Sequence, residues 1–82
     1  MPGMPSIRVL HFGLGPIGSA IARRIAARPG FTIVGAVDID PAKAGQDLSK
    51  LLGIPRRLGV KVQADAAAAL KASKPDVVIH CT

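Results

Sequence analysis

Three glycines at the spacing G-x-G-x-x-G constrain this chain more than any other feature of its sequence. They are Gly13, Gly15 and Gly18, and they lie between the apolar run IRVLHF at 7–12 and a stretch rich in isoleucine. Short apolar, β-rich runs are typical of strands buried on both faces of a parallel sheet. The sequence therefore predicts a strand, then a tight glycine turn, then a helix.

The expected helix begins at Pro16 and is closed by the Pro-Gly pair at 29–30. Ile17, Ile21 and Ile25 recur every four residues, so they are expected to form one apolar stripe. Further along the chain, strands are expected at 31–38, 60–63 and 77–82, and helices at 46–52 and 66–73. The third strand is expected at an edge, the second and fourth are expected to be buried, and Asp65 is expected to cap the last helix.

Strands that alternate with helices form a parallel sheet with right-handed crossovers. The expected fold class is α/β, a Rossmann-type parallel sheet of about four strands with flanking helices, and an incomplete one. The expected strand order is 60–63, 32–37, 7–12, 77–82. This order leaves the apolar last strand at an open edge, where a complete domain would continue.

An acidic residue stands at the distance from the glycines that dinucleotide-binding folds require. Asp38 follows Gly18 by about 20 residues, at the end of the expected second strand. In such folds the first glycine permits the turn, the second admits the pyrophosphate, and the third lets helix and strand pack closely. The helix N-terminus then offers free N–H groups to the phosphates. The alternative is a tight turn without a ligand, in which Asp38 only begins a loop.

The residues around Asp38 also bear on the choice between NAD and NADP. The Asp38 carboxylate would accept hydrogen bonds from the ribose hydroxyls and would repel the 2′-phosphate of NADP. Ile39 follows it in place of an arginine, while Lys43 could still reach a phosphate. The expected cofactor is NAD or NADP, with NAD favoured.

Other polar residues of the expected strands are interpreted as structural. His11 and His80 lie in apolar runs without a third ligand or carboxylate nearby in sequence, so both are expected in the core or at a strand end. Cys81 is expected to be a small buried residue. Thr82 differs, because it ends the last strand at the carboxyl edge, where ligands of open α/β sheets bind. A cofactor contact is expected there.

The charge of the chain raises the alternative of nucleic-acid binding. Lys and Arg number 11 against 5 acidic residues, which gives a net charge of +6. The basic residues are scattered, and 2% aromatic residues offer few rings for stacking on bases, so this class is disfavoured. A single cysteine, the lack of a secretion signal and the lack of an apolar run of about 18–20 residues predict a cytoplasmic protein without a membrane partner.

Three segments carry a resemblance to a known family. They are IRVLHFGLGPIGSAIARRI at 7–25, IVGAVDIDPAKAGQDLSKLLG at 33–53 and KPDVVIHCT at 74–82. Together they resemble the N-terminal NAD(P)-binding domain of the dihydrodipicolinate reductase-like family, within it the diaminopentanoate and related amine dehydrogenases. The resemblance implies an oxidoreductase that uses NAD or NADP on an amine or imine substrate and is a homo-oligomer at full length.

By position, the resemblance implies that Gly13, Leu14, Gly15, Pro16, Ile17, Gly18, Asp38 and Thr82 bind the cofactor. Family members continue into a substrate domain that holds the residues for substrate binding and proton transfer. Residues 1–82 are therefore expected to be the N-terminal part of a dinucleotide-binding domain, with the substrate domain absent and no catalytic or metal-ligating residue assigned. The alternative function is a non-catalytic nucleotide-binding or redox-sensing module.

Overall fold

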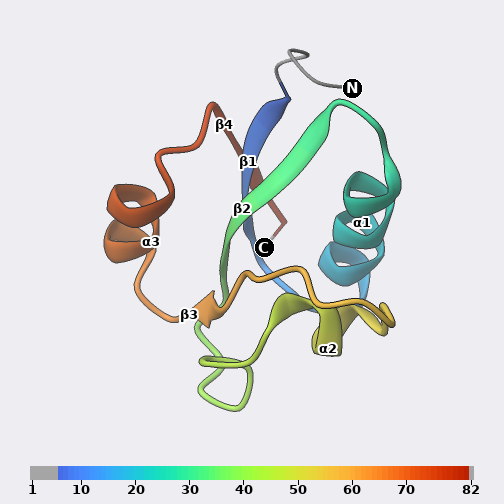
Figure 1. The fold of residues 1–82 in the computed structure, drawn as a ribbon. Coiled ribbons are helices and arrows are strands. Elements are labelled where there is room, and N and C mark those ends of the chain that lie inside the picture. Colours follow the sequence, from blue (N-terminus) through green and yellow to red (C-terminus); the bar gives the residue numbers. More distant parts are fainter. Residues whose placement is uncertain (1–5, 82) are drawn as a thin grey trace.

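The computed structural model describes residues 6–81 and has the alternation of strands and helices that the sequence predicts (Figure 1). In chain order the elements are β1 (Ile7–Phe12), α1 (Pro16–Ala27), β2 (Phe31–Val37), α2 (Leu48–Leu52), β3 (Val62–Gln63), α3 (Ala66–Ser73) and β4 (Val77–His80). The expected α/β fold class is confirmed.

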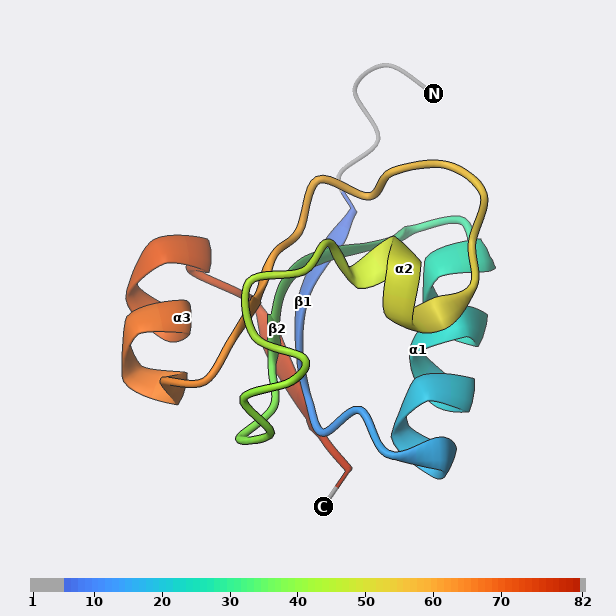
Figure 2. The same cartoon turned by 90° about the horizontal axis from the view of Figure 1, so that it is seen from below.

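The strands form one parallel sheet in the order β3-β2-β1-β4, as expected. Helices α1 and α2 cover one face of the sheet and α3 covers the other (Figure 2). The chain builds outward from β1 through β2 to β3, then returns through α3 to the far side of β1. The strand order thus reverses at β1, and ligands of open α/β sheets bind at such reversals, outside the carboxyl ends of the strands.

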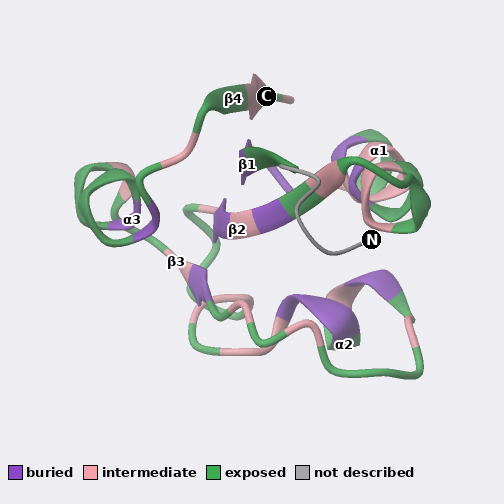
Figure 3. Cartoon of the chain, turned by 45° about the horizontal axis from the view of Figure 1, so that its top comes forward, coloured by how far each residue is buried: buried purple, intermediate pink, exposed green. Residues whose placement is uncertain are grey.

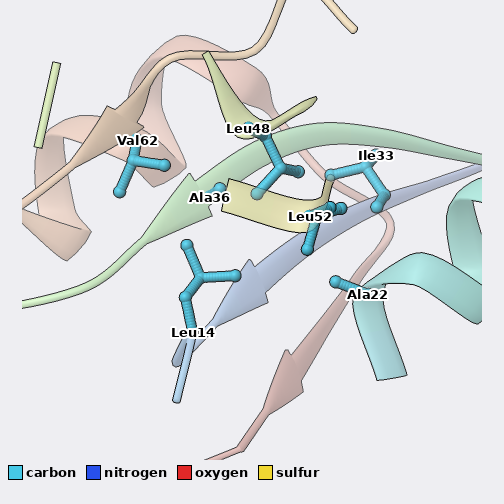
Figure 4. Packing of buried hydrophobic residues seen from close by; sticks show 7 residues of the cluster. All are labelled: Leu14, Ala22, Ile33, Ala36, Leu48, Leu52 and Val62. Carbon is cyan, nitrogen blue, oxygen red and sulfur yellow. The ribbon is translucent and has the colours of Figure 1, made fainter. Parts of the chain in front are cut away.

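The core has a part on each face of the sheet. Under α1 and α2 it consists of buried side chains from the strands, both helices and the glycine loop: Leu14, Ala22, Ile33, Ala36, Leu48, Leu52 and Val62 (Figure 4). Under α3 a smaller cluster joins Leu10, Val37 and Ala69. Leu14 therefore ties the glycine loop to the core while its backbone remains in the turn.

Helix α1 does not bury the face that its isoleucines predict. Its buried residues are Gly18 and Ala22, Ile25 packs at the margin of the core, and Ile17 is 77% exposed. Small residues on the sheet-facing side let the helix lie close to the strands. Because each residue turns the helix by about 100°, the approach through Gly18 carries Ile17 away from the sheet. The apolar stripe of isoleucines is therefore not the face that α1 buries.

Helix α2 begins two residues later than expected and ends where expected. The Asp47 carboxylate accepts a hydrogen bond from the Ser49 amide at 3.0 Å, so Asp47 is the N-cap rather than a helical residue. Gly53 ends the helix with φ 69°, a left-handed conformation that favours glycine. Asp65 caps α3 as predicted, accepting from the amides of Ala67 and Ala68.

Strand β3 is shorter than the expected 60–63, and the segment that leads into it also pairs with the residues before α2. The Val60 carbonyl accepts from the Leu48 amide at 2.7 Å, and the Val62 amide donates to the Gln46 carbonyl at 2.9 Å. Val60 and Val62 direct these groups to the edge that faces away from β2, whereas the Gln63 carbonyl accepts from the Asp38 amide on the β2 side. The expected edge position of this strand is confirmed.

Strand β4 lies at the opposite edge, where the expected order places it, but it is not buried (Figure 3). Val77 is 40% and Val78 47% exposed. The helices pack over the central strands, and β4 has only β1 as a strand neighbour among residues 6–81. The prediction of a strand from this apolar run is confirmed, and the prediction that the strand is buried is wrong.

Candidate functional site

The carboxyl ends of β1 and β2 bring the glycine loop and Asp38 together. Phe12 pairs with Val37 in the sheet, so Gly13 and Asp38 leave it side by side. The Gly13 amide donates to the Val37 carbonyl at 2.9 Å, and the Leu14 amide donates to Asp38 Oδ2 at 2.7 Å. All of the expected cofactor-binding residues except Thr82 thus lie in one region, and Thr82 lies outside the described residues.

Two of the three motif glycines are required by the shape of the turn itself. Gly13 has φ 105°, a conformation that side chains rarely adopt. A Cβ on Gly18 would lie 2.2 Å from the Gly13 carbonyl oxygen. The turn and the first turn of α1 can therefore pack this closely only with glycine at both positions.

Gly15 is different, because nothing in the fold requires a glycine there. Its φ of −70° and ψ of −174° are open to any residue, and a Cβ would meet no atom of residues 6–81 within 4 Å. The space beside its backbone is open at the N-terminus of α1. A side chain would enter the space that the close approach of a phosphate requires.

Among the described residues, no side chain caps the N-terminus of α1. Pro16 occupies its first turn and has no N–H, no acidic residue lies in that turn, and the Ser19 hydroxyl donates to the Leu14 carbonyl at 3.0 Å instead of capping. The amides of Ile17 and Gly18 belong to the first turn, which has no intrahelical acceptors. The positive end of the helix dipole is therefore available to an anion.

Asp38 is held in place and kept ionised by its surroundings. Its Oδ2 accepts from the Leu14 amide and its Oδ1 accepts from the Asp40 amide at 2.9 Å. Burial raises the pKa of Asp38. The two amides and the nearby Lys43 ammonium lower it by more, so the pKa lies below its ordinary value of 3.8. A carboxylate offers about four acceptor positions. Two amide bonds leave others for hydroxyl donors such as those of a ribose.

Lys43 also belongs to this site, although it lies outside the glycine motif and its paired acidic residue. Its Nζ donates to the Leu14 carbonyl at 2.9 Å and lies 3.8 Å from Asp38 Oδ2. The turn that brings it there is held by Asp40, whose carbonyl accepts from the Lys43 amide at 3.0 Å. The Asp-Pro pair at 40–41 was a signal for this turn, but it could not show where the lysine side chain would lie.

His11 lies beneath the loop and is fully buried, which confirms the expectation of a core histidine. Burial lowers its pKa below 6.5, and the nearby backbone of Gly13 and Gly18 only partly offsets this. Neither ring nitrogen has a hydrogen-bond partner among residues 6–81. The neutral form is therefore the one that the folded chain favours.

Acidification is expected to destabilise the chain through His11. With a folded pKa below 6.5, the unfolded chain binds the proton first, so stability is full above about pH 6.5 and falls as the pH drops towards the folded pKa. The loss approaches about 1.4 kcal/mol per pH unit for one proton. Urea unfolding at about pH 7.5 and about pH 5.5 measures it. The dependence should disappear in His11→Leu and persist in His80→Gln; an unchanged dependence in His11→Leu would refute the assignment.

The other polar residues at the strand ends, His80 and Cys81, contact Phe12 of β1. His80 is exposed, and its ring lies 5.0 Å from that of Phe12, centre to centre. Cys81 is half-buried rather than buried, and its amide donates to the Phe12 carbonyl at 2.8 Å. Within residues 6–81 no cluster of His, Cys, Asp or Glu could hold a metal ion. The same residues contain no helix of the length and apolarity needed to span a membrane.

Comparisons with known proteins agree with this geometry. A family model described as dihydrodipicolinate reductase, N-terminus, matches residues 7–82. The 4-hydroxy-tetrahydrodipicolinate reductase of Anaeromyxobacter sp. (strain Fw109-5) is 47% identical over 68 residues, 83% of this chain and 24% of that protein. An amine dehydrogenase structure from Mycobacterium smegmatis matches with a TM-score of 0.83 and 43% identity, over 88% of this chain and 21% of that one. The chain thus spans a quarter or less of either relative, and it belongs to the dihydrodipicolinate reductase family, whose N-terminal domain it matches.

Proposed function

We propose that this chain is the cofactor-binding portion of an NAD(P)-dependent oxidoreductase that acts on an amine or imine substrate. The family, whose reductases use NAD(P)H, and the likeness to an amine dehydrogenase support it. The observation that carries the proposal is the hydrogen bond from the Leu14 amide to Asp38, which joins an acidic strand end to an uncapped helix N-terminus. Residues 1–82 are, on this proposal, the N-terminal part of the dinucleotide-binding domain.

The residues fit the two polar parts of a dinucleotide. The open space at Gly15 and the amides of Ile17 and Gly18 would receive the pyrophosphate, and Asp38 would accept hydrogen bonds from the adenine ribose. Gly13, Leu14 and Pro16 shape and brace this loop. The cofactor, when bound, supplies the hydride chemistry. The residues of this chain bind and orient its adenosine half.

Two exposed apolar side chains also fit a cofactor with flat rings. Ile17 is 77% and Ile39 80% exposed, and they directly follow Pro16 and Asp38. Large exposed aliphatic side chains beside a polar site offer a surface against which a ring can pack. The ionised Asp38 carboxylate and the absence of a cation at position 39 support NAD over NADP as the preferred cofactor.

Calorimetric titration of the 82-residue chain with NADH, NADPH and a DNA duplex tests the proposal. Saturable binding of a nicotinamide dinucleotide is expected. Binding of DNA alone, weakening steeply as salt rises, would contradict the proposal, because that dependence marks phosphate-backbone contacts.

Asp38→Ala is expected to weaken the binding of NADH by about tenfold or more and the binding of NADPH by less. Hydrogen bonds to a charged acceptor contribute about 1.5–3 kcal/mol, and the variant removes them for both cofactors. Only NADPH also escapes the repulsion between its 2′-phosphate and the carboxylate. The matched control is Asp76→Ala, which removes the same charge from an exposed residue before β4, at the amino ends of the strands, and should change neither affinity strongly. A larger loss for NADPH than for NADH would overturn the preference for NAD.

A further inference from the structure

The Lys43 side chain gives the ribose end of the site a charge balance that Asp38 alone would not have. Its ammonium lies 3.8 Å from Asp38 Oδ2 and donates a hydrogen bond to the Leu14 carbonyl. A ligand group that binds at Asp38 therefore lies near both a carboxylate and an ammonium. The repulsion expected between a lone carboxylate and a 2′-phosphate is reduced by this pairing, because the summed charge of the two groups is close to zero.

Lys43 is also free to turn towards a ligand at little cost to the loop. An ammonium has three donors, and one hydrogen bond of Lys43 is formed, to the Leu14 carbonyl. That carbonyl accepts a second hydrogen bond from the Ser19 hydroxyl at 3.0 Å, so it stays satisfied if the lysine moves. The separation from Asp38 exceeds that of a hydrogen bond, and the Lys43 side chain is 28% exposed.

We propose that Lys43 is the specificity-determining residue of the ribose end, and that it binds the 2′-phosphate of NADP so that the site accepts NADP as well as NAD. The inference rests on the proposed function, because it concerns the adenine ribose of the same cofactor. Position 39, where a cation would directly follow the acidic residue, holds an exposed isoleucine. The lysine that closes the 40–43 turn takes over that role from a different place in the sequence.

The test compares NADH with NADPH, and ADP with adenosine 2′,5′-bisphosphate, on the 82-residue chain by calorimetry. Lys43→Met removes the charge with little change in shape, and Lys43→Arg keeps it. Lys71→Met is the matched control, because it removes one positive charge from an exposed position on α3, which covers the opposite face from α1 and α2. Thermal unfolding of each variant verifies that it is folded.

Lys43→Met is expected to weaken NADPH and the bisphosphate by about tenfold or more, the range of a lost charge-assisted hydrogen bond, and NADH and ADP by less than about threefold. Lys43→Arg should retain the binding of NADPH, and Lys71→Met should match the wild type. Equal losses for both cofactors would overturn the inference, since they would mean that Lys43 only braces Leu14. A wild-type chain that binds NADH but not NADPH would overturn it as well. A chain that binds neither cofactor would refute the proposed function itself.

Discussion

Gly18→Ala is expected to destabilise the chain by about 3 kcal/mol or more, which is the upper range for forcing an atom into a packed interior. The new Cβ would lie 2.2 Å from the Gly13 carbonyl oxygen, 2.9 Å from its carbon and 3.3 Å from the Cβ of Cys81. The first two are backbone atoms of a turn that is itself constrained, so they cannot move aside as a flexible side chain would. Urea unfolding measures the loss as a lower midpoint.

Helix propensity predicts the opposite sign for Gly18→Ala, which makes the test decisive. In an exposed helix, alanine is about 1 kcal/mol more favourable than glycine. Gly15→Ala is the matched control, because its Cβ meets no described atom within 4 Å and the φ of −70° at this position suits alanine. Its stability should stay close to that of the wild type. A Gly18→Ala chain as stable as the wild type would mean that the loop and α1 are not packed this tightly.

Gly15→Val is expected to abolish cofactor binding while the chain still folds. Its backbone is in an extended conformation that valine favours, and its side chain would enter the open space at the N-terminus of α1. Blocking the approach of the pyrophosphate removes at least two charge-assisted hydrogen bonds. The expected loss is about 100-fold in Kd or more for NADH and NADPH alike.

The readouts for Gly15→Val are calorimetric titration for binding and thermal unfolding for the fold. Ala27→Val places the same side chain at the exposed far end of α1 and should bind as the wild type does. If Gly15→Val retains wild-type affinity, the glycine loop is not where the pyrophosphate binds. This outcome would count against the proposed function, whereas the Lys43 variants address only the ribose end.

Much of the fold could be predicted because its signals are local. A strand, a glycine turn and a helix follow one another in the sequence, and the cap at Asp65 lies beside the amides that it binds. Burial could be predicted less well, since an apolar run shows that a strand is favoured but not how many neighbours cover it. Val77 and Val78 show the consequence at the exposed edge of the sheet.

The candidate site divides in the same way. The motif and Asp38 were visible in the sequence because their spacing reflects one βαβ unit. The place of Lys43 was not, because it depends on how the 40–43 turn folds back on Leu14. His11 could be assigned to the core, but the packing around its ring decides that its nitrogens have no hydrogen-bond partner in the part of the chain that the structure describes.

The amino-acid sequence by itself determined the order of strands and helices and the family, because these follow from periodicity, turn residues and short motifs along the chain. Only the tertiary structure distinguished the glycines: Gly18 is required by a carbonyl that crowds it, and Gly15 leaves space that the fold does not use. Only the tertiary structure showed that Asp38 accepts from the Leu14 amide and that Lys43 donates to the Leu14 carbonyl. The physical reason is that residue type shows what a position permits, whereas distances between segments remote in sequence decide what it does.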